Sequence, residues 1–218
     1  MAKKFIWDLP IRVFHWVLAI LLCGSWYTVE VTGDMDTHML IGQTILVLGI
    51  FRIVWGFIGT RYARFGSFLY KPAAIVAYAK SLAGRGGAAY AGHNPLGGLV
   101  VLLMLALVLL QASTGLFATD GDFYSGPLNH LISGRAGNQV TDFHAANFNV
   151  LLSVVIVHVI AVALYLLVKR ENLVAPMFTG SKDDPSSSFT PIDGSKLLAA
   201  GTVLLLAAAV VYAVVTLL

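Results

Sequence analysis

The stretch DFHAANFNVLLSVVIVHVIAVALYLLVKR, residues Asp142–Arg170, carries two histidines in a segment that is otherwise mostly apolar. A helix that crosses a bilayer needs about 20 predominantly apolar residues, and this stretch is long enough. His144 and His158 are 14 residues apart, so they lie on one face of the helix and about 21 Å apart along its axis. Ionisable side chains inside a membrane are costly and mark candidate functional sites. These two imidazoles are too far apart for one metal ion, but they could bind two separate large groups.

The composition extends this interpretation to the whole chain. Of 218 residues, 58% are hydrophobic and 11% are charged, whereas about a quarter of a soluble domain is charged. No part shows the short alternating runs of a membrane β-barrel. The sequence therefore predicts an all-α integral membrane helical bundle with five spanning segments, at residues 11–31, 39–59, 96–118, 143–168 and 197–218.

The predicted domain organisation follows from these segments. Residues 1–170 form a four-helix bundle, residues 171–195 form a polar cytoplasmic linker, and residues 196–218 form a fifth transmembrane helix. The first segment is long and lacks a small-x-small site, so it is predicted to remain as a helix and not to be a cleaved signal peptide. The single cysteine, Cys23, excludes an internal disulfide and a Cys₄ metal cluster.

The basic residues predict the orientation. Cytoplasmic loops of membrane proteins are rich in Lys and Arg. With a cytoplasmic N-terminus and a periplasmic C-terminus, 13 of the 14 Lys and Arg residues lie inside, and only Arg135 lies outside. The outer loops are acidic and contain Glu30, Asp34, Asp36, Asp120, Asp122 and Asp142. The net charge of +3 thus reflects membrane topology and gives no reason to expect nucleic-acid binding.

The loop between the second and third spanning segments predicts a short helix. Pro72 suits a first helical turn, and Gly84, Gly86 and Gly87 would end the helix. Its mixture of basic and aromatic residues is typical of an amphipathic segment on the inner membrane surface.

Four histidines sort into two pairs by their depth in the membrane. His38 and His144 follow outer acidic residues, whereas His15 and His158 each lie 11 residues from an inner lysine. A haem iron takes one axial ligand from each side of its ring, and neutral imidazole is a good ligand. The pairs predict an outer haem bound by His38 and His144 and an inner haem bound by His15 and His158. Other large apolar cofactors remain open, and a single histidine near a helix end is often only an interfacial residue.

Several motifs resemble the bacterial cytochrome b561 family, which includes the cytochrome b subunits of nickel–iron hydrogenases. They are WDLPIRVFHW, GHNPLGG and the two histidines of the 143–168 segment, and FRIVWGFIGTRYARF looks like the hydrogenase-type branch. The resemblance covers about Phe5 to Arg170. It implies a di-haem b-type cytochrome of the bacterial inner membrane, with haem ligands at His15, His38, His144 and His158. The fifth helix departs from the minimal four-helix members.

Other polar residues are candidates for secondary roles. His93 and Asn94 precede the third spanning segment and could contact an inner haem propionate or a quinone, or could only shape the start of that helix. Arg12 and Arg52 could pair with propionates, because arginine binds carboxylates through two hydrogen bonds, or could anchor at the lipid headgroups. His130 is expected to face solvent or a partner. Gly42, Gly49, Gly97 and Gly98 allow close helix packing or make room for a flat ring.

The predicted function is electron transfer through two b-type haems between a periplasmic redox partner and the quinone pool. The partner would be a hydrogenase-like enzyme or a c-type cytochrome, and the chain would be an electron-transfer subunit and not a stand-alone catalyst. One alternative is a superoxide:quinone oxidoreductase, for which Arg135 offers the only outer basic side chain. A second is a histidine-lined transporter, for which Gln111, Ser113 and Thr114 are among the few polar residues in the spanning segments.

Overall fold

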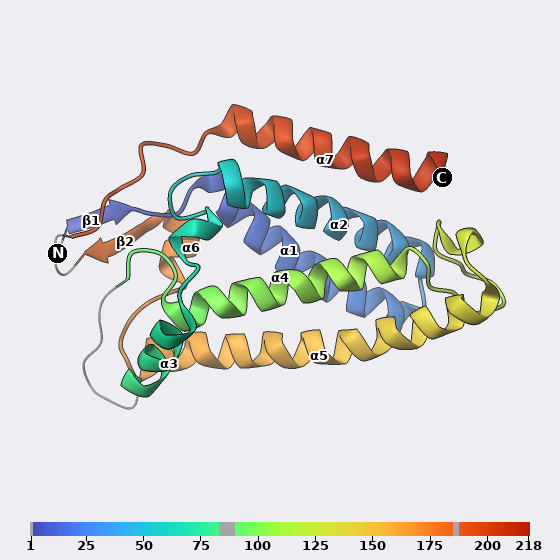
Figure 1. The fold of residues 1–218 in the computed structure, drawn as a ribbon, viewed down its shortest axis with the longest axis horizontal. Helices are drawn as coiled ribbons and strands as arrows, with labels where there is room; N and C mark the ends of the chain where they lie inside the picture. Colours follow the sequence, from blue (N-terminus) through green and yellow to red (C-terminus); the bar gives the residue numbers. More distant parts are fainter. Residues whose placement is uncertain (1, 83–89, 185–187) are drawn as a thin grey trace. The chain divides into compact units, whose positions relative to one another are not determined.

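Long apolar helices dominate the computed structural model, which describes residues 2–82, 90–184 and 188–218. Within that part of the chain, five helices are long and apolar enough to cross a membrane. They are α1 (Leu9–Tyr27, continued by a π-helical turn over Thr28–Thr32), α2 (Met35–Ile58), α4 (Pro95–Gly115), α5 (Gly134–Leu167) and α7 (Leu197–Leu217), all seen in Figure 1. The predicted all-α membrane bundle is confirmed.

Shorter elements join these helices. They are α3 (Pro72–Ser81), α6 (Ala175–Thr179), the 3₁₀ turns Phe65–Ser67 and Asn129–Leu131, and the strands β1 (Ala2–Phe5) and β2 (Ser181–Asp184). The predicted helix that opens at Pro72 is α3, which contains no buried residue and exposes half of the Val76 side chain. Gly84, Gly86 and Gly87, which were predicted to end it, lie outside the described residues.

The segment that follows α5 is more ordered than its polar sequence indicates. β2 pairs with β1 in antiparallel register, with Phe5 opposite Ser181. The backbone N–H of Ile192 donates to the carbonyl of Phe5 (2.9 Å), and Phe189 and Ile192 are buried. Each strand has only four residues, which is too few for an alternating pattern to be recognised in the sequence. Each strand also needs the other for its backbone hydrogen bonds.

The chain divides into two compact units. The sheet unit comprises Met1–Val13, Ile53–Leu103 and Val157–Ala200, and contains β1 and β2. The core unit comprises Phe14–Arg52, Met104–Ile156 and Gly201–Leu218.

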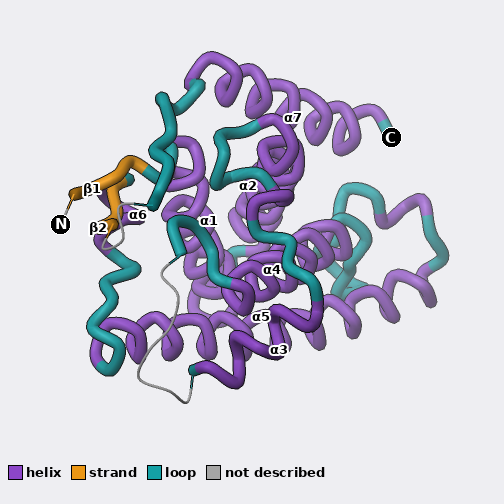
Figure 2. Tube along the Cα trace, turned by 60° about the vertical axis from the view of Figure 1, so that its left-hand side comes forward, coloured by secondary structure: helices purple, strands orange, loops and turns teal. Residues whose placement is uncertain are grey.

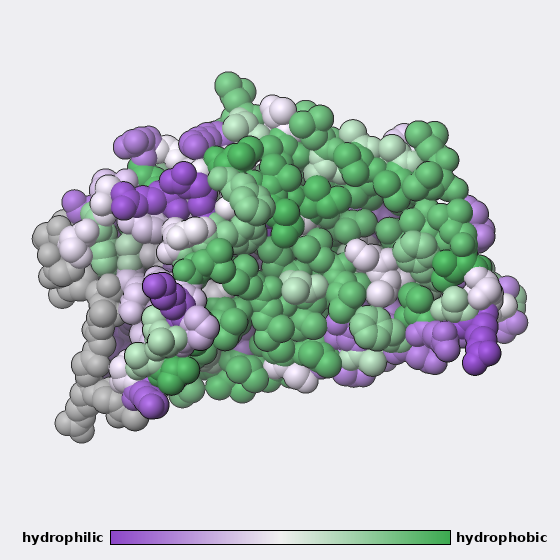
Figure 3. All heavy atoms as spheres, in the orientation of Figure 1, coloured by the Kyte–Doolittle hydropathy of each residue, from purple (hydrophilic) through white to green (hydrophobic). Residues whose placement is uncertain are grey.

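One apolar cluster organises the core unit. Its buried residues come from α2, α4, α5, α7 and the loop after α4: Ile45, Leu46, Val108, Ala112, Leu116, Leu128, Leu151 and Val211. Because Val211 belongs to this cluster, the fifth helix packs against the others in this unit. The rest of the surface of α7 is apolar and exposed, and the side chains of Leu205 and Tyr212 are more than 70% accessible. Figure 3 shows apolar side chains along α7. Such a surface suits contact with lipid.

Two helices begin earlier than hydropathy indicates. α2 begins at Met35, where the Asp34 carboxylate accepts a hydrogen bond from the Thr37 N–H (3.0 Å) and caps the helix. A hydrogen bond from the Thr37 side chain, followed by this backbone bond, lowers the pKa of Asp34. α5 begins at Gly134 and not at residue 143, because residues 134–142 are polar but helical. Hydropathy locates the part of a helix that lies in lipid, and a helix can extend beyond it.

A buried carboxylate holds the sheet unit together around the start of α1. Asp8 is 1% exposed. One of its oxygens accepts the N–H of Ile11 (2.7 Å) and caps α1, and the other accepts Trp55 Nε1 (3.1 Å) and the Thr60 hydroxyl (2.5 Å). The carboxylate thus ties the start of α1 to the end of α2. Figure 2 gives a second view of these helices.

We expect Asp8→Ala to destabilise the protein strongly. The change removes a helix cap, which contributes about 1 kcal/mol, and leaves two buried donors unsatisfied at about 1–3 kcal/mol each. The thermal unfolding midpoint of purified Asp8→Ala should fall well below that of the control Asp122→Ala, whose carboxylate is in an exposed loop. Equal midpoints for the two variants would refute the central role of Asp8.

Candidate functional site

Two of the predicted ligand histidines lie close together in the core unit. His38 lies in the first turns of α2 and His144 lies in α5, and both side chains are partly buried. Their ring centroids are 6.4 Å apart, and the ring planes are nearly perpendicular at 86°. The structure therefore brings together the pair that membrane depth predicts for the outer site.

The Nδ1 atom of His38 is held by α1. It lies 3.1 Å from the backbone carbonyl oxygen of Ser25 and 3.1 Å from the Ser25 hydroxyl. A carbonyl oxygen can only accept, so we infer that Nδ1 carries the ring proton. In a neutral imidazole this leaves the lone pair on Nε2, the nitrogen that is then able to bind a metal.

The Nδ1 atom of His144 is held in the same way by α4. It lies 3.0 Å from Oγ1 of Thr114. The Thr114 hydroxyl has one hydrogen, which is donated to the carbonyl of Leu110 (2.8 Å). Oγ1 therefore accepts from Nδ1–H of His144, and the lone pair again lies on Nε2. Such outer hydrogen bonds, which fix the tautomer and the ring orientation, are typical of metal-binding histidines.

Glycines make room around these rings. A Cβ atom on Gly115 would lie 3.1 Å from Cε1 of His144, so a larger residue there would press on the imidazole. Gly42 is one turn after the histidine of α2, and a Cβ there would meet nothing within 4 Å. Gly49 differs, because a Cβ there would collide with the side chain of Leu109. Gly42 thus borders open space, whereas Gly49 serves helix packing.

The donor set fits a haem iron. Two imidazoles on one metal place their ring centres about 6 Å apart, given metal–nitrogen bonds of about 2 Å plus the distance from each nitrogen to its ring centre. The observed 6.4 Å matches this value. Among the described residues, no three His, Cys, Asp or Glu side chains gather as a protein-only metal site would require. Two opposed imidazoles are the axial set of a b-type haem.

The other two predicted ligands lie in different units. His15 belongs to α1 in the core unit, where its ring meets the edge of Trp16 at 5.0 Å. His158 belongs to α5 in the sheet unit and is partly buried. The pairing of His15 with His158 stays a prediction.

His93 packs between two aromatic rings of the sheet unit. Its ring centroid is 4.8 Å from that of Trp7 and 4.7 Å from that of Phe68. Its backbone carbonyl accepts a hydrogen bond from the Tyr70 hydroxyl (3.0 Å). The imidazole therefore lies in an aromatic setting at the start of α4.

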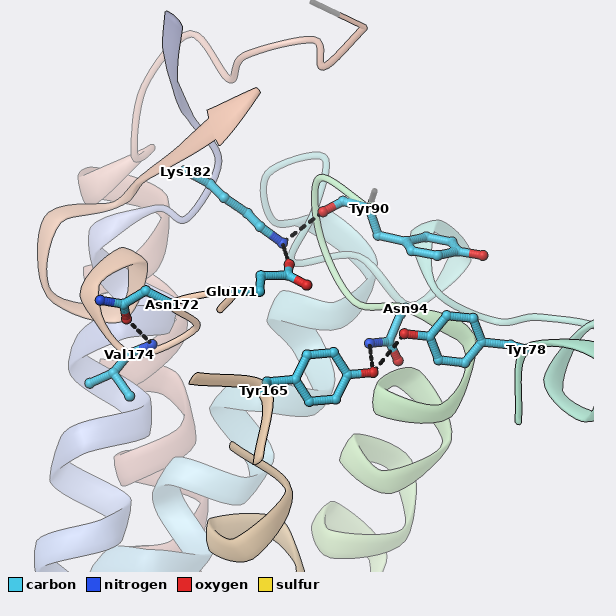
Figure 4. A network of polar contacts seen from close by, with 8 residues as sticks. All are labelled: Tyr78, Tyr90, Asn94, Tyr165, Glu171, Asn172, Val174 and Lys182. Atoms are coloured by element: carbon cyan, nitrogen blue, oxygen red, sulfur yellow. Dashed lines mark hydrogen bonds and ion pairs between the residues drawn. The ribbon is translucent and has the colours of Figure 1, made fainter. Parts of the chain in front are cut away.

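Asn94 caps α4 and joins a polar network (Figure 4). Its Oδ1 accepts the N–H of Gly97 (2.7 Å), and its Nδ2 donates to the Tyr165 hydroxyl (3.3 Å). The Tyr165 and Tyr78 hydroxyls are 2.6 Å apart, which ties α3 to the end of α5. Burial is the main cause that raises the pKa of Tyr78, and this hydrogen bond is the second. Because both ends of the Asn94 amide are engaged, its geometry favours a structural role over contact with a cofactor.

The same network continues toward β2. Lys182 forms an ion pair with Glu171 (2.9 Å) and donates to the Tyr90 carbonyl (2.8 Å). These contacts fasten β2 to the segments beside α4 and α5, as Figure 4 shows.

The remaining polar candidates have distinct surroundings. Nη1 of Arg12 donates to the backbone carbonyl of Phe178, in α6. Arg52 is 4% exposed, whereas a residue that anchors at the lipid headgroups needs an exposed side chain. His130 is exposed, as predicted, and its Nε2 lies 2.8 Å from the carbonyl oxygen of Leu218, which holds the end of α7.

Sequence reasoning missed the residues that orient the ligands. Ser25 and Gly115 carry no signal within apolar helices, and the sequence alone offers Thr114 only as one of few polar residues for a transport path. A hydroxyl or carbonyl near a membrane histidine is the signal that could have found them, but it requires knowing which helices are neighbours.

Comparison with known families agrees with this geometry. The family model described as prokaryotic cytochrome b561 matches residues 6–180, a range that includes all six histidines and ends before α7. Comparison with curated proteins and with solved structures gave no match.

We expect Thr114→Val to weaken haem binding at the His38–His144 site without removing a ligand. Loss of the acceptor for Nδ1–H frees the ring of His144, and such changes lower affinity about 10–100-fold. Haem titration and a redox titration should show weaker retention and a shifted midpoint potential. Thr44→Val is the matched control, because the Thr44 hydroxyl bonds only within its own helix, to Leu40. Identical behaviour of the two variants would show that Thr114 does not position His144.

Proposed function

Since the chain belongs to the prokaryotic cytochrome b561 family, we propose that it carries electrons across the membrane through two b-type haems. Family membership makes the protein a membrane b-type cytochrome that acts in electron transfer. The number of haems, their ligands, the orientation and the partners are our proposal.

The observation that carries the proposal is the His38–His144 pair. The imidazoles of His38 and His144 come from different helices, and their ring centroids are 6.4 Å apart, close to the separation of two ligands on one metal. Ser25 of α1 and Thr114 of α4 each hold one Nδ1. We assign this pair to the outer haem. We assign His15 and His158 to the inner haem, because α5 is one continuous helix and places His158 on the face that carries His144.

The chain supplies position and surroundings for the reaction. When bound, haem supplies a one-electron couple at its iron, and the protein tunes that couple through ligands, hydrogen bonds and burial. The Ser25 carbonyl and the Thr114 hydroxyl fix the two imidazoles as neutral Nδ1–H tautomers. Fixed rings need little rearrangement when the charge on the bound group changes, which favours fast electron exchange.

Exposed acidic residues of the core unit support a basic periplasmic partner. Glu30, Asp34, Asp36, Asp120, Asp122 and Asp142 all belong to the core unit and are exposed. A backbone hydrogen bond from Tyr124 lowers the pKa of Asp120, so this carboxylate stays charged. Negative surfaces steer basic proteins to them. A basic c-type cytochrome or a hydrogenase-like enzyme would fit there.

A quinone is the proposed redox partner at the inner side. His93 lies at the start of α4 between Trp7 and Phe68. An imidazole in an aromatic pocket can donate or accept a proton as a quinone changes its charge, because its ordinary pKa is near working pH. Of the residues that the sequence offers for this contact, His93 is the one we retain.

The number of haems tests the proposal. Purified protein should show a reduced b-type spectrum with two haems per chain. His144→Ala should lose one haem, His158→Ala should lose the other, and each variant should keep its remaining haem at least in part. His130→Ala is the control and should keep both, because His130 bonds only the end of α7. Full haem occupancy in either ligand variant would disprove the pairing, and no haem in the native protein would favour a transporter.

The orientation is tested separately. Thirteen of 14 Lys and Arg residues lie on the side proposed to be cytoplasmic. A reporter fused after Leu218 should be active as a periplasmic protein, and one inserted near Arg85 should be active as a cytoplasmic protein. A cytoplasmic C-terminus would invert the proposed outer and inner sites or remove α7 from the membrane.

A further inference from the structure

The segment that follows α2 packs against other parts of the sheet unit. Its buried residues include Thr60, Ala63, Phe65 and Phe68. The Thr60 hydroxyl donates to Asp8 (2.5 Å), and the Phe65 ring occupies the space beside Gly56, where any side chain would collide with it. A 3₁₀ turn over Phe65–Ser67 closes the segment. The segment therefore has a defined shape at the end of a membrane-spanning helix.

The residues between these buried positions face outward and line a surface cavity that is widely open. Arg61, Arg64, Gly66 and Ser67 are exposed. Together with Gly56 and Phe57 from the last turns of α2 they line a cavity of about 420 Å³. A Cβ atom on Gly66 would meet nothing within 4 Å, so this side of the cavity is open. The wall contributed by α2 is apolar, and the Phe57 ring is 68% exposed.

The guanidinium groups of the two arginines carry their charge at the surface of the described residues. In the described part of the chain neither guanidinium forms an ion pair or a hydrogen bond, and Arg61 only lies 6.0 Å from the centre of the Tyr62 ring. The last carbonyls of α2 attract cations, but Lys196 already binds the carbonyls of Ile58 and Gly59 (both 3.3 Å). The positive charge of Arg61 and Arg64 is therefore available to an external anion.

We propose that this cavity binds the headgroup of an anionic phospholipid. Arginine binds phosphate oxygens through two parallel hydrogen bonds, and Ser67 lines the same cavity three residues after Arg64. No carboxylate lines the cavity. The site is at the end of α2, where a bilayer places its phosphate groups, and Phe57 offers an apolar wall for the glycerol and the first part of an acyl chain. Basic pockets at such positions bind acidic lipids in other membrane proteins.

Native mass spectrometry of the delipidated, haem-loaded protein tests this site. Phosphatidylglycerol and phosphatidylcholine with the same acyl chains are added in parallel. The native protein should retain phosphatidylglycerol preferentially. The double variant Arg61→Gln/Arg64→Gln should weaken that retention about tenfold or more, because each basic residue near an acidic headgroup adds to binding. The control Lys71→Gln/Lys80→Gln removes the same charge from exposed positions of the same unit and should retain the lipid normally.

Three results would overturn the proposal. Equal loss in both double variants would mean that positive charge alone attracts the lipid. Equal retention of phosphatidylcholine would mean that the cavity recognises only apolar chains. Full displacement of phosphatidylglycerol by millimolar inorganic phosphate would mean that the cavity binds free phosphate and not a lipid.

A second variant covers the case in which the arginine variant does not fold. Gly66→Glu introduces a carboxylate into the open side of the cavity, where the structure has room for a side chain. It should abolish the preference for phosphatidylglycerol while both haems stay bound. An unchanged preference in Gly66→Glu would also contradict the proposal.

Discussion

An imidazole inside an apolar helix needs a partner for each ring nitrogen, and part of the core unit is arranged around that requirement. Unsatisfied buried polar groups are costly. For His38 and His144, one nitrogen of each ring is bonded to a neighbouring helix through Ser25 or Thr114. The second nitrogen of each ring is left with a lone pair, and the two ring centroids are 6.4 Å apart. In our proposal, a haem iron bound between the two rings satisfies both lone pairs.

Irregular local structure brings these partners into place. α1 widens into a π-helical turn directly after the segment that holds Ser25. The Ser25 carbonyl accepts hydrogen bonds both from the Thr28 hydroxyl (2.9 Å) and from His38. π-helical turns occur frequently at functional sites. At the other histidine, Gly115 ends α4 where a larger residue would press on the His144 ring. The site therefore depends on how helices end as much as on the ligands themselves.

Hydropathy and histidine spacing predict much of this arrangement. Apolar length identifies all five spanning helices, and depth in the membrane selects the His38–His144 pair before any contact is known. The family resemblance is confirmed over residues 6–180. The sequence does not predict the β1–β2 pairing, the polar extension of α5 before residue 143, or the burial of Arg52. These features depend on contacts between segments far apart in the chain, which periodicity within one segment cannot reveal. The roles of Ser25 and Thr114 were missed for the same reason.

The central claim is that His38 and His144 bind one haem iron with nearly perpendicular rings. Electron paramagnetic resonance of the oxidised protein at low temperature tests it directly. Perpendicular axial imidazoles leave two iron d orbitals almost equal in energy and give a strongly anisotropic low-spin ferric signal, whereas parallel rings give an ordinary rhombic one. The 86° angle between the rings predicts that the strongly anisotropic signal is present. Rhombic signals alone, or a high-spin signal from an iron with a single histidine, would contradict the account.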